Sequence, residues 1–462
     1  MIRSLGEALS KLTRRYMPEP FTIALALTVV TFLVAALTTP GSLLELLGFW
    51  GGRLDGDAVV AKERGFWMLI AFAMQMCLIL VTGFALASTP LAKRAIAWLA
   101  ERPRTGNQAI AGTALVAMMA AYINWGLGLI VGALLARDVA RACRRQGIPV
   151  HYPLVGAAGY TGLLVWHGGF SGSAPFKVTQ AKDVAELLPG VDIGVIPLEQ
   201  TILSPLNLTI SVLMLILVPI ILVRMSPPVD QMQPIEPGQG GEEGDDQESD
   251  EDAEKTPAAF LERSPILAWI MGGAALTYLF VYLSKIGFNR ADLNAINLFF
   301  LALGLILHGS PLAYGRAVGR AASGCAGIIL QFPFYAGIMG LMQQSGLMQE
   351  ASNLVAEVAT KDSFEALTFL SAGIVNLFVP SGGGQWGVQG SIVMQSAQAL
   401  DVPLGNAVMA FAYGDGWTNM LQPFWALPLL AITGLKAREL IGYTAALMFL
   451  VGPVIIVCLT LF

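Results

Sequence analysis

Charged residues are scarce in this chain, and their scarcity excludes most soluble folds. Only 13% of its 462 residues are Asp, Glu, Lys or Arg, whereas 55% are hydrophobic. A soluble protein of this length would need a larger charged fraction to cover its surface. The chain is therefore expected to lie in a membrane, where lipid covers its apolar side chains.

Histidine and cysteine are also rare, with three and four copies. An intramembrane enzyme would need a nucleophile–base pair or a metal cluster, and these few residues offer neither. The sequence also lacks the GxxxxGKS or GxxxxGKT phosphate loop of ATP-driven pumps. We therefore expect no enzyme activity, no cofactor and no metal site, with energy taken from an ion gradient. The cysteines, expected to be small buried side chains, are Cys77, Cys143, Cys325 and Cys458.

Long apolar runs recur along the chain. A helix of about 20 residues spans the roughly 30 Å hydrocarbon core of a bilayer. The runs predict an all-α polytopic membrane protein with about nine transmembrane helices and two re-entrant hairpins. Its first 20 residues predict an amphipathic surface helix ended by Pro18 and Pro20, not a removable signal peptide. The clearest runs are 21–37, 66–87, 201–223, 266–283, 327–342 and 443–462.

An acidic segment, 226–263, divides the membrane part into two halves, 1–225 and 264–462. Twelve of the 32 acidic residues lie in it, against two of the 27 basic ones, so the rest of the chain has 25 bases and 20 acids. The segment is rich in Pro and Gly and cannot bury a core of its own. It is predicted to be a disordered cytoplasmic linker.

Positive charges set the predicted orientation, because cytoplasmic loops are enriched in Lys and Arg. Lys11, Arg14 and Arg15 predict a cytoplasmic N-terminus. Stretch 109–136 has basic residues on both sides but only 28 residues, too few for two spans, so it is predicted to be a re-entrant hairpin from the cytoplasm. Stretch 364–400 lacks basic flanks and is predicted to be a second hairpin from the opposite side.

The two halves resemble each other around these hairpins. "AAYINWGLGL" (120–129) and "SAGIVNLFVPSGGGQW" (371–386) both place an Asn at the end of a helix of small residues, followed by a glycine-rich break. A second broken apolar run follows in each half, around 168 and 418. Matching units of opposite orientation are typical of inverted-repeat transporters. Irregular backbone inside a membrane must be covered by protein or line a cavity, so the four breaks predict a substrate site at the midplane.

Glycine backbone and helix N-termini could bind a small anion there, and neutral Ser, Thr and Asn side chains could add donors. Asp415, in an apolar neighbourhood, is interpreted as either an ion carrier or a helix cap. His167 is interpreted as either a titrating group or a pocket wall. Predicted substrate-binding residues of the first half are Asn124, Trp125, Gly126, Gly128, His167, Gly168, Gly169, Ser171 and Ser173. Those of the second half are Asn376, Ser381, Gly382, Gly383, Gly384, Trp386, Thr418 and Asn419, with Asp415 assigned to ion coupling.

Six motifs in order resemble the bacterial short-chain fatty acid transporter family, from about residue 15 to 462. They are "MPEPFTIALALTVVTF", "INWGLGLIVGALLARDVAR", "GGFSGSAP", "ILQFPFYAGI", "VPSGGGQWGVQG" and "AYGDGWTNMLQPFWALP". The resemblance implies uptake of butyrate- or acetoacetate-like acids. Together with the lack of a phosphate loop, it leads us to expect a symporter of the bacterial inner membrane, coupled to H⁺ or Na⁺. More loosely, the chain is similar to the wider ion-transporter group. The Ser-Asn-Thr tips of the dicarboxylate carriers in that group are replaced here by Asn124-Trp125-Gly126 and Ser381-Gly382-Gly383, so sodium ligands are not carried over.

Several alternatives stay open at this point. A C4-dicarboxylate or other organic-anion carrier of the same group is the second functional candidate, and a passive channel is the third. The expected partners are a small carboxylate and the lipid bilayer, with a homodimer left open and no nucleic acid.

Overall fold

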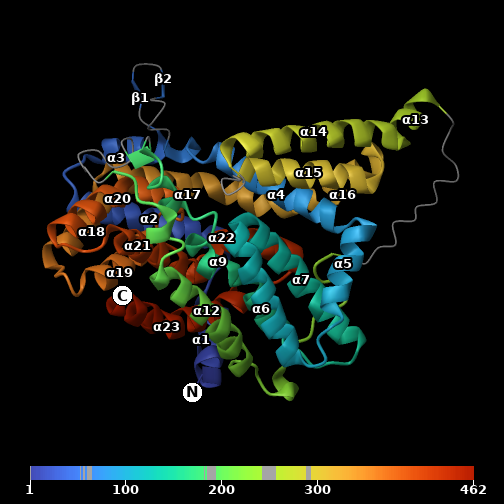
Figure 1. Cartoon of the computed structure of the whole chain (residues 1–462), viewed down its shortest axis with the longest axis horizontal. Helices are drawn as coiled ribbons and strands as arrows, with labels where there is room; N and C mark the ends of the chain where they lie inside the picture. Colours follow the sequence, from blue (N-terminus) through green and yellow to red (C-terminus); the bar gives the residue numbers. More distant parts are fainter. Residues whose placement is uncertain are drawn as a thin grey trace.

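The computed structural model describes residues 2–52, 54–55, 58–59, 65–181, 183–184, 194–241, 256–287 and 293–462. These residues are overwhelmingly helical, with strand only in the two-residue antiparallel pair β1 (Leu54–Asp55) and β2 (Ala58–Val59) (Figure 1). The predicted all-α polytopic membrane fold is confirmed. In the described part of the chain, seven segments are long and apolar enough to cross a membrane: Pro20–Thr38, Gly65–Ala87, Gly106–Ile123, Pro205–Arg224, Pro265–Lys285, Pro311–Gln344 and Ala437–Leu461.

Many of the helices begin at a Ser-Pro or Thr-Pro pair. The hydroxyl oxygen accepts a hydrogen bond from a backbone N–H of the first turn, and the proline takes a position that needs no N–H donor. Ser204, for example, accepts from the N–H of Asn207 at 3.2 Å. Helices that start this way are α5 (Pro90–Ala100), α12 (Pro205–Arg224), α13 (Pro257–Arg263), α14 (Pro265–Ile286) and α16 (Pro311–Ala322).

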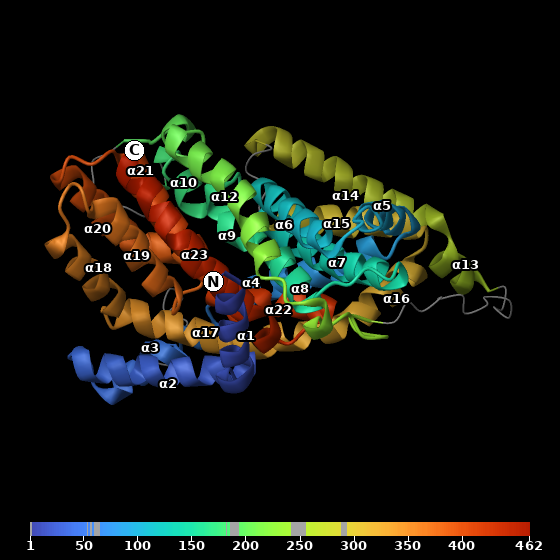
Figure 2. The ribbon, with the colours of Figure 1, turned by 90° about the horizontal axis from the view of Figure 1, so that it is seen from below.

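One group of helices forms an outer layer. In it, α4 (Ile70–Ala87) packs along α15 (Leu293–His308) and α16, and α14 packs on α15, as the pair at the upper right of Figure 1 shows. At the other end of this layer, α2 (Pro20–Thr38) and α3 (Leu43–Gly51) pack against α17 (Ala326–Gln344) (Figure 2). Apolar side chains such as Leu37 and Trp269 are exposed on this layer, as expected where lipid takes the place of a protein core.

The inner bundle repeats one arrangement, a helix pair followed by a broken helix. Every residue of the short helix α8 is buried, because α6, α7 and α23 surround it. The first unit comprises α6 (Gly106–Ile123), α7 (Trp125–Arg145), α8 (Tyr152–Tyr160), α9 (Gly162–Val165), the turn η2 (Trp166–Gly168) and α10 (Ser173–Lys177). The second comprises α19 (Phe364–Asn376), α20 (Gly382–Ala399), α21 (Leu404–Thr418), the turn η8 (Asn419–Leu421) and α22 (Pro423–Thr433).

Three further helices complete the chain. Helix α1 (Ile2–Tyr16) is the predicted N-terminal helix, and it packs on α23 (Ala437–Leu461). Helix α18 (Leu347–Val358) packs between α17 and α20.

The first helix pair is longer than the predicted hairpin. The first pair extends over 106–145, beyond the predicted 109–136, and is interrupted only at Asn124. The apolar part of α7 ends at Ala136 before Arg137, so it is about 18 Å long at about 1.5 Å per residue, too short for a full span. This length favours a re-entrant pair, although α6 alone is long enough to cross. The re-entrant and inverted orientations stay predictions.

The structure also differs from the predicted disordered linker. Its last residues, 257–263, form α13, and residues 226–241, called the strap below, lie against the inner bundle. Arg144 Nη1 on α7 donates to the carbonyl of Ile235 at 3.0 Å, and Gln239 Nε2 donates to that of Gly434 at 3.2 Å. The acidic residues of 242–255 lie outside the described part of the chain.

Candidate functional site

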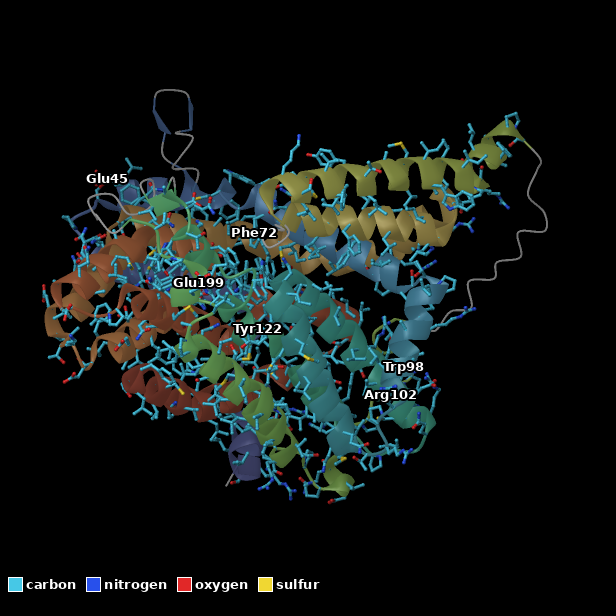
Figure 3. The ribbon with its side chains drawn as sticks, viewed as in Figure 1. Glu45, Phe72, Trp98, Arg102, Tyr122 and Glu199 are labelled. Carbon is cyan, nitrogen blue, oxygen red and sulfur yellow. The ribbon has the colours of Figure 1, made fainter. Side chains whose placement is uncertain are left out.

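The first hairpin tip is fastened to the broken helix that follows it. The N–H of Phe170 donates to the carbonyl of Tyr122 at 2.7 Å, and the N–H of Trp125 donates to Ser171 Oγ at 2.9 Å. A side chain at Gly169 would place its Cβ 2.6 Å from the carbonyl oxygen of Tyr122. Glycine at this position therefore permits the close approach. Tyr122 lies near the middle of the molecule (Figure 3).

Asn124 caps α7 at this tip. It is buried, and its Oδ1 accepts from the N–H groups of Gly126 at 2.9 Å and Leu127 at 3.2 Å. The helix N-terminus that was predicted to receive an anion thus uses several of its donors within the protein. The first tip is the better packed of the two and leaves fewer groups for a ligand.

The second break is held by a buried amide network around Asn376. Its Nδ2 lies 2.7 Å from the carbonyl of Asp415, 3.0 Å from Thr418 Oγ1 and 2.9 Å from Asn419 Oδ1. Gln422 Nε2 donates to the carbonyl of Asn376. All of these residues except Gln422 were predicted from the sequence. The feature that could have indicated Gln422 is its amide side chain directly before Pro423 in an apolar run.

His167 and Asp415 form a buried pair where the two broken helices meet. Their side chains are each 1% exposed, and Nδ1 lies 2.5 Å from Oδ2. The N–H of Ala174, in the first turn of α10, donates to His167 Nε2 at 3.1 Å. Because Nε2 accepts, the imidazole proton lies on Nδ1 and points at the carboxylate. Both residues are predicted from the sequence, but their pairing is not.

The second hairpin tip rests on this pair. Ser381 caps α20, and its Oγ accepts from the N–H of Gly384 at 3.2 Å. A Cβ on Gly382 would lie 2.8 Å from His167 Cε1, 3.0 Å from the ring of Trp166 and 3.1 Å from Asp415 Oδ2. The tip can therefore reach the pair only because residue 382 has no side chain.

A lysine that the sequence prediction missed lies beside this tip. Lys177 Nζ is 3.4 Å from the carbonyl oxygen of Gly383. The lysine ends α10, whose first turn holds His167. The only sign of Lys177 in the sequence was a lysine shortly after "GGFSGSAP". The sequence did not show that this lysine lies at the hairpin tip of the second half.

Further hydrogen bonds join the two halves around the pair. Tyr160 Oη donates to the carbonyls of Asn419 at 2.9 Å and Gln422 at 3.0 Å. Asn419 Nδ2 donates to the carbonyl of Leu163 at 3.2 Å. Behind the first break, Asn207 Nδ2 donates to the carbonyl of Gly168 at 3.0 Å. Segments more than 200 residues apart thus form one polar crossing inside an apolar bundle.

Two predicted residues pack away from this crossing. A Cβ on Gly128 would collide with the backbone and side chain of Ala121, so this glycine serves the close contact of α6 and α7. Trp386 is fully buried and packs edge-on against Phe411 at 4.9 Å. Ser173 lies closer, with its Cβ 3.8 Å from the position of a Cβ on Gly383.

Some buried polar atoms at the crossing have no hydrogen-bond partner among the described residues. They are Trp166 Nε1, Asn376 Oδ1 and Gln422 Oε1. Unpaired buried polar atoms are costly and call for a ligand, an ion or water. Within the part of the chain that the structure describes, no group of three His, Cys, Asp or Glu could hold a metal ion. The crossing therefore combines a buried His–Asp contact with amide and indole groups that lack a partner among the described residues.

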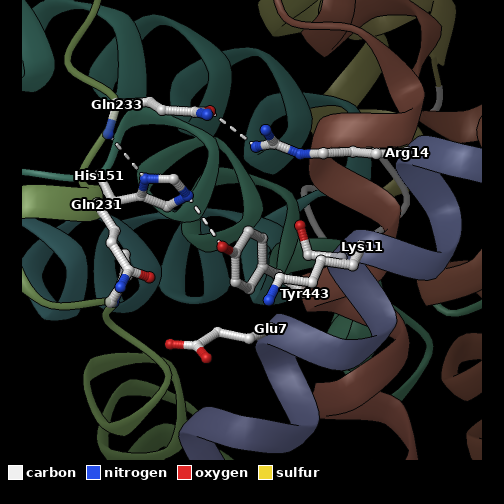
Figure 4. A pocket seen from close by; sticks show the side chains of 9 residues that line it. Glu7, Lys11, Arg14, His151, Gln231, Gln233 and Tyr443 are labelled. Atoms are coloured by element: carbon white, nitrogen blue, oxygen red, sulfur yellow. Dashed lines mark hydrogen bonds between the residues drawn. The ribbon is translucent and has the colours of Figure 1, made fainter.

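A separate polar cavity of about 110 Å³ lies between α1, the strap and α23 (Figure 4). Here His151 Nδ1 accepts from the N–H of Gln233 at 3.0 Å, and Nε2 lies 2.9 Å from Tyr443 Oη. Burial, together with the nearby charge of Arg14, lowers the pKa of His151 to about 4. The group is therefore a neutral structural contact and not a proton carrier at neutral pH.

The whole chain, residues 1–462, matches the family model described as short chain fatty acid transporter. A protein of Escherichia coli K12, provisionally named a short-chain fatty acid transporter, is 41% identical over the full length of both chains. A protein of Haemophilus influenzae Rd with the same provisional name is 39% identical over 99% of each chain. Among solved structures, the YdaH transporter of Alcanivorax borkumensis is 15% identical, with a TM-score of 0.44 over 96% of this chain and 97% of that one.

Proposed function

Because the chain belongs to the short-chain fatty acid transporter family, we propose that it moves monocarboxylates such as butyrate or acetoacetate by ion-coupled symport. The observation that supports this best is the buried His167–Asp415 pair, on which the second hairpin tip rests. An ionisable pair inside a membrane protein is costly and is expected to serve proton or ion movement.

A proton is the coupling ion that this pair favours. His167 already holds one proton on Nδ1, facing Asp415. A further proton would go either to the Asp415 carboxylate or to His167 Nε2, and the second choice displaces the N–H of Ala174. Proton uptake on Nε2 would then move α10 and change the contact with the second tip.

Sodium is the second candidate. Asn376 Oδ1 and Gln422 Oε1 have no hydrogen-bond partner among the described residues, and Thr418 Oγ1 and Asn419 Oδ1 lie at 3.0 and 2.9 Å from Asn376 Nδ2. Neutral oxygens of this kind would suit a small monovalent cation. Sodium bound there would neutralise charge without titrating the His–Asp pair.

The wider setting belongs to the same proposal. The chain is a multi-pass membrane protein, and we place it in the bacterial inner membrane with a cytoplasmic N-terminus. The short apolar part of α7 and the repeated order of hairpin and broken helix support two re-entrant hairpins in inverted repeats. We also propose a homodimer. The mass of the purified protein in detergent tests it.

The experiment is uptake of labelled butyrate and acetoacetate into proteoliposomes under an imposed proton or sodium gradient. Proton symport predicts accumulation with an inward proton gradient in the absence of sodium. Accumulation that requires sodium would identify sodium, and not the proton, as the coupling ion. If succinate competes for uptake more strongly than butyrate does, the C4-dicarboxylate alternative is favoured. If the labelled acid only reaches equal concentrations inside and outside the vesicles, a passive channel is favoured.

A further inference from the structure

We propose that Lys177 is the substrate-selecting residue: its ammonium binds the carboxylate between α10 and the second hairpin tip, and so restricts transport to small monocarboxylates. This inference rests on the proposed function and deepens it. It assigns a role to a residue that neither the motifs nor the relatives' names single out.

Lys177 lies against the second hairpin tip. Its Nζ lies 3.4 Å from the carbonyl of Gly383 and 3.3 Å from the position that a Cβ on Gly383 would take. Lys177 and Gly383 are half-buried, and so are Ser173 and Ser381 beside them. These four residues form a partly accessible polar patch directly next to the fully buried His167–Asp415 pair. A small solute can therefore meet a positive charge here before it reaches the pair.

The patch carries hydrogen-bond donors that suit a carboxylate. Hydrogen bonds between an ammonium and a carboxylate are about twice as strong as neutral ones, and a low-dielectric setting strengthens them further. Hydroxyl groups of Ser173 and Ser381 lie within the same patch. Trp166, whose ring lies against Gly382, carries a buried indole N–H without a partner among the described residues. Among the described residues, the patch therefore combines the Lys177 ammonium with neutral donors, a set that suits a carboxylate.

The neighbours of the patch select against a second carboxylate. Asp415 Oδ2 lies 3.1 Å from the position of a Cβ on Gly382, so a second negative charge beside the tip would meet a like charge. On the other side, Met339 Cε lies 3.3 Å from the position of a Cβ on Gly384. A flexible thioether is suited to pack a short alkyl tail. The geometry thus fits an acid with one charged end and one small apolar end.

Helix α10 also connects this contact to the proton site. Its first turn donates from Ala174 to His167 Nε2, and its last residue is Lys177. A carboxylate that draws Lys177 toward α20 therefore acts on the same five-residue helix that holds the imidazole. Lys177 selects the substrate, and a movement of Lys177 shifts α10 and thereby its hydrogen bond to His167.

Purified full-length protein in proteoliposomes tests the proposal with Lys177→Gln, Lys177→Arg and, as a control, Lys361→Gln. Lys361 is exposed and pairs with Asp401 at 2.8 Å, away from the crossing. We expect Lys177→Gln to raise the KM for butyrate about 10-fold or more, as for loss of a hydrogen bond to a charged group. Preference for butyrate over uncharged butyramide, measured by competition, should fall by a similar factor. Lys177→Arg should restore most of the affinity for butyrate and most of the preference for butyrate over butyramide. Lys361→Gln should change neither quantity.

A purely structural role for Lys177 would leave the preference for the charged compound intact, and that outcome would overturn the proposal. A second measurement uses the unmodified protein and avoids misfolded variants. An amine-reactive reagent should modify Lys177 more slowly in butyrate than in butyramide, with Lys361 as the internal reference. Equal rates in a preparation that transports butyrate would also overturn it. If the unmodified protein transports no butyrate under either gradient, the proposed function itself fails.

Discussion

At the scale of single residues, the hydrogen bond from Ala174 to His167 Nε2 has the largest consequence. It fixes the imidazole tautomer and leaves the Nδ1 proton shared with Asp415 across 2.5 Å. In the proposed proton symport, a second proton on this pair must go either to Asp415 or to His167 Nε2, where it would displace the N–H of Ala174 on α10. The carboxylate should therefore be needed for coupling but not for substrate binding.

Asp415→Asn tests this separation. The amide keeps a similar shape and can still accept from His167 Nδ1, but it cannot take up a proton. We expect accumulation driven by a proton gradient to fall about 100-fold or more, in the range of general acid–base groups, while butyrate exchange at equal pH persists. Uptake into proteoliposomes measures the first and counterflow measures the second. A variant that still accumulates butyrate with full proton dependence would leave Asp415 a structural cap.

His151 makes a different pH prediction, at the contact between α1, α8 and the strap. Its pKa is lowered to about 4 by burial, below the ordinary value of about 6.5. The unfolded chain therefore takes up the proton first, so stability is constant above about pH 6.5 and is lost as the pH falls toward 4. The full loss is about 3 kcal/mol. Melting of the detergent-solubilised protein should show this slope, and His151→Gln should flatten it; an unchanged slope would contradict the assignment.

At the scale of helices, the two glycine-containing tips are not equivalent. Gly128 lies where a Cβ would meet the backbone of Ala121, whereas a Cβ on Gly383 would meet only side-chain atoms of Lys177 and Ser173, at 3.3 Å or more. The first glycine therefore serves packing between helices, whereas the second is expected to serve access of the substrate to the patch.

Matched substitutions at these glycines should separate the two roles. Gly128→Ala overpacks the α6–α7 contact, which costs about 1–3 kcal/mol, so we expect a lower melting temperature. Gly383→Val should leave the melting temperature nearly unchanged but reduce butyrate uptake on the order of 10-fold or more by displacing the substrate. Thermal melting and uptake on the same preparations decide the matter. Transport-dead but fully stable Gly128→Ala would show that the first tip also faces the substrate.

Apolar runs predicted the membrane helices well, because about 20 consecutive apolar residues have few alternatives to a buried or spanning helix. The run predicted over 266–283 is α14, at Pro265–Ile286. Glycine and asparagine likewise predicted the breaks at Asn124 and 377–381. What the sequence could not provide was the pairing of these breaks, because His167 and Asp415 are 248 residues apart and each has several possible neighbours. Lys177 was missed for the same reason.

At the scale of the whole molecule, the strap shows why composition misjudged the region between the halves. Pro, Gly and acidic residues predict a chain without a core of its own, and that expectation is sound for an isolated segment. The strap gains its position from the bundle instead. Arg144 on α7 donates to Ile235, and the N–H of Gln233 donates to His151. These bonds use backbone groups of the strap, so its side-chain composition gave no sign of them.

The strap and the acidic residues after it should therefore behave differently when altered. Replacing 242–255, which holds nine of the acidic residues, by glycine and serine of equal length keeps the reach between the halves. We expect uptake within about twofold of the unmodified protein, as for changes at surface positions without specific contacts. Arg144→Ala should instead loosen the strap, seen as faster limited proteolysis within 226–241, because the carbonyl of Ile235 loses its donor. If the acidic replacement abolished uptake while the strap stayed protected, the acidic charges themselves would be required for transport, and a passive linker would be the wrong description of this region.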